Sequence, residues 1–200
     1  MTNSVKPIVH LVHGFNVSDG GKGSVGKLKD FFLAEGYFTN MVDYGWIGLG
    51  GVSYKNPSVS KKLMMVVNDG DIGVGHSNGC AILHDAACRG AKFKTLVFIN
   101  PALDVDLTVP LGVERIHVWH SPSDVPVRAW HKLEQTLPFI QKWLDHPWGE
   151  MGAKGYMGDD PRYINFNKET DFERSSDGHS DMFDWDKICY FGREIVKKLR

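Results

Sequence analysis

One turn in this chain restricts its fold more than any other feature. It is the pattern Gly-His-Ser-Asn-Gly over residues 75–79, which lies between an apolar run at 71–76 and a helical pattern at 78–89. A strand-to-helix turn of this kind is so tight that the residues two positions before and after Ser77 must lack side chains. It lifts the serine hydroxyl clear of the sheet and points the first amides of the helix at whatever approaches it. The turn therefore predicts a strand that runs directly into a helix, with an exposed hydroxyl between them.

Short apolar runs alternate with helical patterns along the rest of the chain. Strands are expected at Ile8–Val12, Phe38–Tyr44, Asp71–His76, Thr95–Asn100, Arg115–His120 and Tyr163–Asn167. Helices are expected at 25–35, Pro57–Asn68, Asn78–Arg89 and Asp184–Arg200, with a loop at Trp46–Asn56 and with Leu63–Val67 also fitting a strand. This alternation predicts an α/β domain with a doubly wound, mainly parallel six-stranded sheet and helices on both faces. Ligands of such sheets bind beyond the carboxyl ends of the strands.

The chain has the size of one domain. Its 200 residues and 22.4 kDa predict a single unit over 1–200. Residues 126–162 are the one stretch that breaks the alternation, since prolines interrupt it and glycines follow. We interpret this stretch as an insert, and as a candidate cap or lid.

Composition excludes several classes of function. The 23 basic and 24 acidic residues give a net charge of −1, which provides no basic surface for nucleic acid or an anionic membrane. The longest apolar stretch, Leu63–Val67, is too short to cross a bilayer, and the first seven residues hold no apolar signal core. We therefore expect a cytoplasmic protein. The three cysteines form no Cys-x-x-Cys pair, which predicts neither a disulfide framework nor a cysteine zinc site.

A serine hydroxyl needs a base before it attacks a substrate near neutral pH. Among nine histidines we favour His179, because it lies in a polar loop, 176–181, between the last expected strand and the last helix. Such a base needs a carboxylate that orients it. Asp124 directly follows the strand at 115–120 and is the preferred partner, while Asp104, after the preceding strand, stays open as the alternative.

The end of the first strand supplies a second part of the candidate site. It reads His13-Gly14-Phe15. The oxyanion of a tetrahedral intermediate needs two amide donors, and Gly14 lets the backbone approach the serine closely. We expect the amides of Phe15 and Asn78 to be this pair, with Asn16 as the alternative to Phe15.

The chain order Ser77, Asp124, His179, together with His13-Gly14 and the turn at 75–79, resembles the α/β-hydrolase superfamily. The resemblance spans nearly the whole chain and implies a minimal version of that fold. It also implies a serine nucleophile, an acyl-enzyme intermediate and no metal or other cofactor. We therefore expect a carboxylesterase or lipase-like hydrolase that cleaves a carboxylic ester, or a related acyl bond, of a small molecule.

Three tryptophans are candidates for substrate binding. Trp46 follows the second expected strand, and Trp130 and Trp148 lie in the insert at 126–162. Aromatic side chains suit the binding of apolar groups, so we expect these residues to contact an apolar part of the substrate. The alternative is that they only pack the insert onto the domain, which is the more common role of large aromatic residues.

Another motif favours a different class of function. Gly21–Lys27 nearly matches the phosphate loop Gly-x-x-x-x-Gly-Lys-[Ser/Thr], but Leu28 stands where that motif has the hydroxyl that binds magnesium. Nucleotide binding through this loop is the second hypothesis. The third is an α/β binding module that keeps the turn at Ser77 without its chemistry. The oligomeric state stays open.

Overall fold

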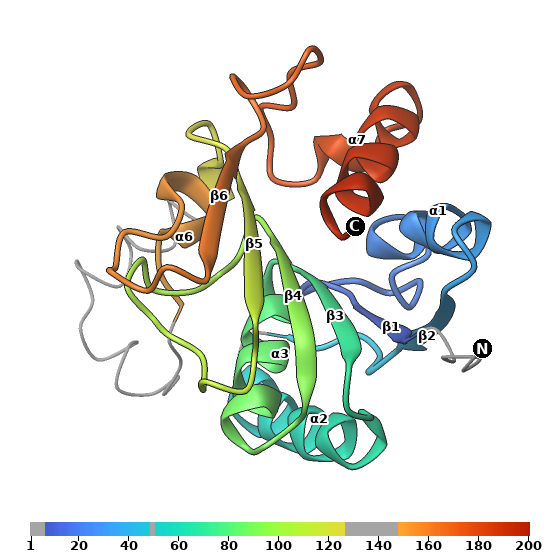
Figure 1. Cartoon of the computed structure of the whole chain (residues 1–200), viewed down its shortest axis with the longest axis vertical. Helices are drawn as coiled ribbons and strands as arrows, with labels where there is room; N and C mark the ends of the chain where they lie inside the picture. Colours follow the sequence, from blue (N-terminus) through green and yellow to red (C-terminus); the bar gives the residue numbers. More distant parts are fainter. Residues whose placement is uncertain (1–6, 49–50, 127–147) are drawn as a thin grey trace.

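The computed structural model describes residues 7–48, 51–126 and 148–200. Six strands within these ranges form one sheet (Figure 1). They are β1 (Ile8–Val12), β2 (Phe38–Val42), β3 (Asp71–His76), β4 (Phe93–Ile99), β5 (Arg115–His120) and β6 (Tyr163–Asn167). Their order in space is β2-β1-β3-β4-β5-β6, and each neighbouring pair is parallel. This confirms the expected doubly wound, six-stranded sheet.

Helices cover both faces of the sheet (Figure 1). Those of the described residues are η1 (Val25–Leu28), α1 (Lys29–Ala34), α2 (Val52–Val66), α3 (Asn78–Cys88), α6 (Met151–Lys154), η3 (Asp181–Phe183) and α7 (Trp185–Lys198). α2 and α3 lie on one face, and α1 and α7 lie on the other. Each face buries its own apolar cluster, with Leu83 and Phe98 in the first and Phe32 and Phe191 in the second. Burial of this apolar surface is the main source of the stability of the domain.

α2 begins five residues earlier than the sequence predicts. We expected a loop at Trp46–Asn56 and a helix start at Pro57, but the helix begins at Val52 and contains Pro57. The reason is packing, because Val52 and Asn56 are buried and continue the buried stripe that includes Val59, on a helix that packs against α3. Proline lacks an amide hydrogen, yet tertiary burial of a helix face outweighs that local preference here. Leu63–Val67, which also fitted a strand, is helical through Val66.

The cysteines are separate free thiols, with Cys80 buried and Cys88 and Cys189 exposed. Burial raises the pKa of the Cys80 thiol, which keeps it protonated and unreactive. No helix in the three described ranges has both the length and the apolar character needed to cross a bilayer.

Several histidines are buried in the neutral form, and they make stability depend on pH. Burial lowers the pKa of His76 to about 3 and that of His117 to about 4, while burial also lowers those of His84 and His120. Between the unfolded pKa of about 6.5 and these lower values, the unfolded chain binds protons that the folded chain does not. Stability that is present above pH 6.5 is therefore lost as the pH falls.

We expect the free energy of unfolding to drop by about 2 kcal/mol for each of His76 and His117 between pH 7 and pH 5. Urea unfolding at pH 7, 6 and 5 measures this slope. A His117→Gln variant, which removes one of the titrating groups, should show a shallower slope. Equal unfolding free energies at pH 7 and pH 5 would contradict the burial of neutral histidines.

Candidate active site

Ser77 occupies the sharp turn between β3 and α3. Its backbone has φ +53° and ψ −121°, a left-handed conformation that is strained for a residue with a side chain. A Cβ on Gly75 would lie 2.8 Å from the amide nitrogen of Cys80, and one on Gly79 would lie 2.6 Å from the carbonyl oxygen of His13. These distances confirm that both flanking positions need glycine. The Ser77 side chain makes no capping hydrogen bond to α3.

His179 and Asp124 are bonded to each other. His179 Nδ1 lies 2.9 Å from Asp124 Oδ1 and 2.8 Å from Oδ2, and because a carboxylate only accepts, Nδ1 carries the proton. This leaves Nε2 of the neutral ring as the acceptor. The Asp124 side chain is completely buried, while that of His179 is 17% exposed. The Asn100 side-chain amide also donates to Asp124 Oδ2 at 2.7 Å, which fixes the carboxylate from a second direction.

His179 lies next to the turn that holds Ser77. The rings of His76 and His179 are 4.8 Å apart, and His76 Nε2 donates to the backbone oxygen of His179 at 3.0 Å. The turn at residues 75–79 and the loop at 176–181 are therefore in direct contact, although a hundred residues separate them. The turn that holds Ser77 and the bonded pair of Asp124 and His179 therefore lie at the same edge of the sheet, at the carboxyl ends of β3, β5 and β6.

Asp104, the alternative acid, is not the carboxylate that His179 contacts. It is exposed, and its side chain lies against the backbone of Gly149, where a Cβ would collide with it. The carboxylate that His179 contacts is that of Asp124.

The expected oxyanion loop passes directly over the serine turn. A Cβ on Gly14 would lie 3.2 Å from Ser77 Cβ and 3.1 Å from His76 Nδ1, so only glycine allows this approach without displacement. Within the described part of the chain, the amides of Phe15 and Asn78 have no hydrogen-bond acceptor. Neither amide is therefore engaged by another group of the described chain. Asn16, the alternative donor, has φ +57°, and its side chain accepts a hydrogen bond from Trp46 Nε1.

Two charged residues at the end of β6 hold the loops that carry the acid and the histidine. Lys168 is buried, and its Nζ donates to the Gly178 carbonyl oxygen at 3.0 Å. Glu169 accepts hydrogen bonds from Ser121 Oγ at 2.5 Å and from the Ser123 amide at 2.7 Å. Burial lowers the pKa of Lys168 to about 8, so the ammonium group stays largely charged at neutral pH. The sequence pattern singles out neither residue, and the only signal for them is their position directly after a strand.

The three candidate tryptophans have different surroundings. Trp46 is 62% exposed beside the expected oxyanion loop, where its Nε1 donates to Asn16 Oδ1. Trp148 is buried; its ring meets Phe15 edge-on at 5.8 Å, and its Nε1 donates to Asn78 Oδ1 at 3.1 Å. Trp130 lies outside the described residues.

The loop at Gly21–Lys27 does not have the structure of a phosphate cradle. The Asp19 carboxylate already accepts the amides of Gly21 at 2.9 Å and Gly23 at 2.6 Å. Burial by itself would raise the pKa of Asp19, but these two amides hold it below its usual value. Lys27 Nζ donates to the carbonyl oxygen of Phe183 at 2.7 Å. The donors that would bind phosphate are therefore occupied by groups of the protein itself, which argues against the nucleotide hypothesis.

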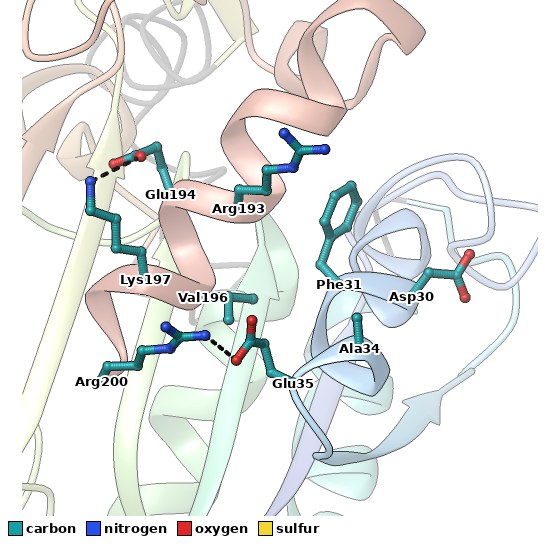
Figure 2. A pocket seen from close by; sticks show the side chains of 9 residues that line it. All are labelled: Asp30, Phe31, Ala34, Glu35, Arg193, Glu194, Val196, Lys197 and Arg200. Carbon is teal, nitrogen blue, oxygen red and sulfur yellow. Dashed lines mark hydrogen bonds and ion pairs between the residues drawn. The ribbon is translucent and has the colours of Figure 1, made fainter.

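A surface hollow of about 560 Å³ lies between α1 and α7 (Figure 2). Four of its charged residues form two pairs, Arg200 with Glu35 and Lys197 with Glu194. None of the residues that line it belongs to the cluster around Ser77, so we do not assign substrate binding to it. Among the residues that the structure describes, no group of three or more His, Cys, Asp or Glu side chains is arranged to hold a metal ion.

Comparison with known proteins finds similarity at the level of structure. No protein-family model and no curated protein matches the chain. The mouse alpha/beta hydrolase domain-containing protein 10 is 16% identical, with a TM-score of 0.61 over 97% of this chain and 91% of its own. A monoacylglycerol lipase from Paleococcus ferrophilus is 14% identical, with a TM-score of 0.58 over 97% of this chain and 95% of its own.

A third solved structure extends this similarity. The mature lipase BlEst2 from Bacillus licheniformis is 11% identical, with a TM-score of 0.56 over 100% of this chain and 94% of its own. All three matches span nearly the full length of both chains. At such low identities they show a shared fold.

Proposed function

Since this chain has the α/β-hydrolase fold, in a version built on six parallel strands, we propose that it is a serine hydrolase that cleaves a carboxylic ester or a related acyl bond. The observation that carries the proposal is the hydrogen bond between His179 and the buried Asp124. The loop that holds His179 also contacts the turn of Ser77 through His76. A nucleophile, a base and a carboxylate in this order along the chain are the parts that acyl transfer needs.

The proposed reaction has two halves. His179 Nε2 takes the proton of Ser77 while Oγ attacks the carbonyl carbon, and the resulting tetrahedral oxyanion collapses to an acyl-enzyme as the leaving alcohol receives that proton. Water then attacks the acyl carbon with His179 again as base, which releases the acid and restores Ser77. Asp124 keeps the proton of His179 on Nδ1 and stabilises the imidazolium that forms in each half.

In this mechanism the amides of Phe15 and Asn78 bind the oxyanion. Two features support this assignment. In the described part of the chain no group accepts a hydrogen bond from either amide, and Gly14 lies close to Ser77. Donors that are fixed before the reaction stabilise the charge as it develops, because they need no reorganisation.

We propose that the substrate carries an apolar acyl group. The exposed Trp46 ring beside the oxyanion loop and the Trp148 ring against Phe15 support this, and Trp130 stays a further candidate. Two of the similar structures are named as lipases, one of them a monoacylglycerol lipase. We expect turnover of p-nitrophenyl esters to depend on acyl length, and a panel from acetate to decanoate measures that dependence.

A fluorophosphonate probe tests the proposal directly, since it reacts with activated serines. We expect mass spectrometry to find the label on Ser77, and prior denaturation of the protein should prevent it. If the native protein stays unlabelled and hydrolyses no ester of the panel, it is a binding module with an inactive turn. A rise in melting temperature with MgATP or MgGTP would instead support the hypothesis that the loop at Gly21–Lys27 binds a nucleotide.

A further inference from the structure

A buried polar network lies behind the two proposed oxyanion donors. It joins the β1 loop, the segment after β2, α2 and α3 through the side chains of His13, Tyr44, Asn56, Asn78 and Trp148. Tyr44 is 6% exposed, Asn56 3% and Asn78 0%, so its central members are shielded from water. Buried polar groups are costly unless they are fully bonded, and such networks rigidify the backbone that they contact.

The first half of the network acts on the peptide between Gly14 and Phe15. The carbonyl oxygen of Gly14 accepts the Tyr44 hydroxyl at 2.7 Å and His13 Nδ1 at 2.9 Å. The Tyr44 hydroxyl also lies 2.9 Å from the His13 carbonyl oxygen, and its ring stacks on that of His13 at 3.9 Å. In a planar trans peptide the carbonyl and the next amide point in opposite directions. The bonds to Gly14 therefore determine where the amide of Phe15 points.

The second half acts on Asn78, whose amide is the other donor. Its side chain forms a reciprocal pair with Asn56, with distances of 2.8 Å and 3.0 Å. Its Oδ1 also accepts from Trp148, and its Nδ2 reaches the Tyr44 hydroxyl at 3.4 Å. These contacts fix the first residue of α3 on three sides. Tyr44 is the member that touches both halves, and burial raises its pKa, so it stays a donor.

We propose that Tyr44 is a positioning residue that aligns the two oxyanion donors through Gly14 and Asn78. This inference rests on the proposed function. Tyr44 touches no reacting atom in the mechanism. It makes the donors rigid before the substrate arrives, so that the oxyanion meets amides that already point at it.

Tyr44→Phe removes the hydroxyl and keeps the stacked ring. We expect kcat for a p-nitrophenyl ester to fall about 10- to 100-fold, less than the loss of a whole oxyanion donor, with KM changed less than about threefold. Affinity for an alkyl trifluoromethyl ketone, which adds to the serine and carries the oxyanion, should fall by the same factor as kcat. A change in stability alone would not produce this parallel loss.

Tyr163→Phe is the matched control. Tyr163 also donates its hydroxyl to a carbonyl, that of Leu107 at 2.8 Å, but it lies on β6 outside the network. It should keep the wild-type kcat. If Tyr44→Phe does not fold, Asn56→Ala replaces it, and the same parallel loss of kcat and ketone affinity is expected.

The outcomes separate this inference from the proposed function. A wild-type protein that neither labels with the fluorophosphonate nor hydrolyses esters overturns the proposed function, and this inference with it. An active wild type whose folded Tyr44→Phe variant keeps full kcat and full ketone affinity overturns the role of Tyr44 alone. Where only Asn56→Ala folds, full kcat and full ketone affinity in that variant overturn the alignment of Asn78 by the network, on which the role of Tyr44 depends. A loss that appears equally in Tyr163→Phe also overturns it, since the effect would then be general.

Discussion

Replacing Ser77 with alanine is expected to reduce ester turnover by roughly four to six orders of magnitude. The hydroxyl is the proposed nucleophile, and neither the amides nor His179 can replace its attack. The variant should fold normally, because the Ser77 side chain makes no capping hydrogen bond to α3 and alanine places the same Cβ atom in the left-handed turn. We therefore expect the melting temperature to change little.

The measurement is kcat/KM for a p-nitrophenyl ester, together with thermal unfolding and fluorophosphonate labelling. Ser175→Ala is a suitable control, because Ser175 is an exposed serine between β6 and His179. It should behave as wild type in all three assays. A folded Ser77→Ala protein that keeps a tenth or more of the wild-type rate would rule out Ser77 as the nucleophile.

Asp124→Asn is expected to lower kcat by about four orders of magnitude. Asparagine has the same shape, but its amide group can donate to His179 Nδ1 and so leave the proton of the ring on Nε2. In that tautomer Nε2 no longer accepts the proton of Ser77. The carboxylate accepts hydrogen bonds from both His179 and Asn100, so the exchange also disturbs the bond from Asn100.

Asp104→Asn is the matched comparison, since the sequence left both acids open. Asp104 is exposed and lies against Gly149, so we expect its variant to keep kcat within about threefold of wild type. Combining Asp124→Asn with Ser77→Ala should add little to the loss from Ser77→Ala alone, because residues that act as one unit are not additive. A larger effect from Asp104→Asn than from Asp124→Asn would reverse the proposed assignment of the acid.

The sequence predicts structure best where the residues of a short segment determine the conformation of that segment. β1, β3, β5 and β6 begin and end at the predicted residues, because short apolar runs between polar segments have few other ways to bury their side chains. The start of α2 was wrong for the opposite reason. Pro57 favours a helix start, but the buried face that begins at Val52 is created by tertiary packing, in which α2 lies against α3, and it is not visible in the local pattern.

The loop at Gly21–Lys27 shows the same limit for a functional motif. Its glycines and lysine match those of a phosphate loop, but Leu28 stands where the phosphate-loop motif has a serine or threonine. The side chain that occupies the loop is that of Asp19, whose two oxygens bind the amides that a phosphate would need. Which acceptor fills a set of amides depends on how the loop is folded in three dimensions.

The amino-acid sequence by itself determined the alternation of strands and helices, the strained turn at Ser77, and the need for glycine at its two flanks, because these follow from periodicity and sterics over a few residues. Only the tertiary structure decided that Asp124 is the carboxylate bonded to His179 and that Tyr44 joins Gly14 to Asn78. The partners in these contacts are 30 to 55 residues apart. Their meeting depends on the order of strands in the sheet and on the burial of both faces, which no local pattern encodes.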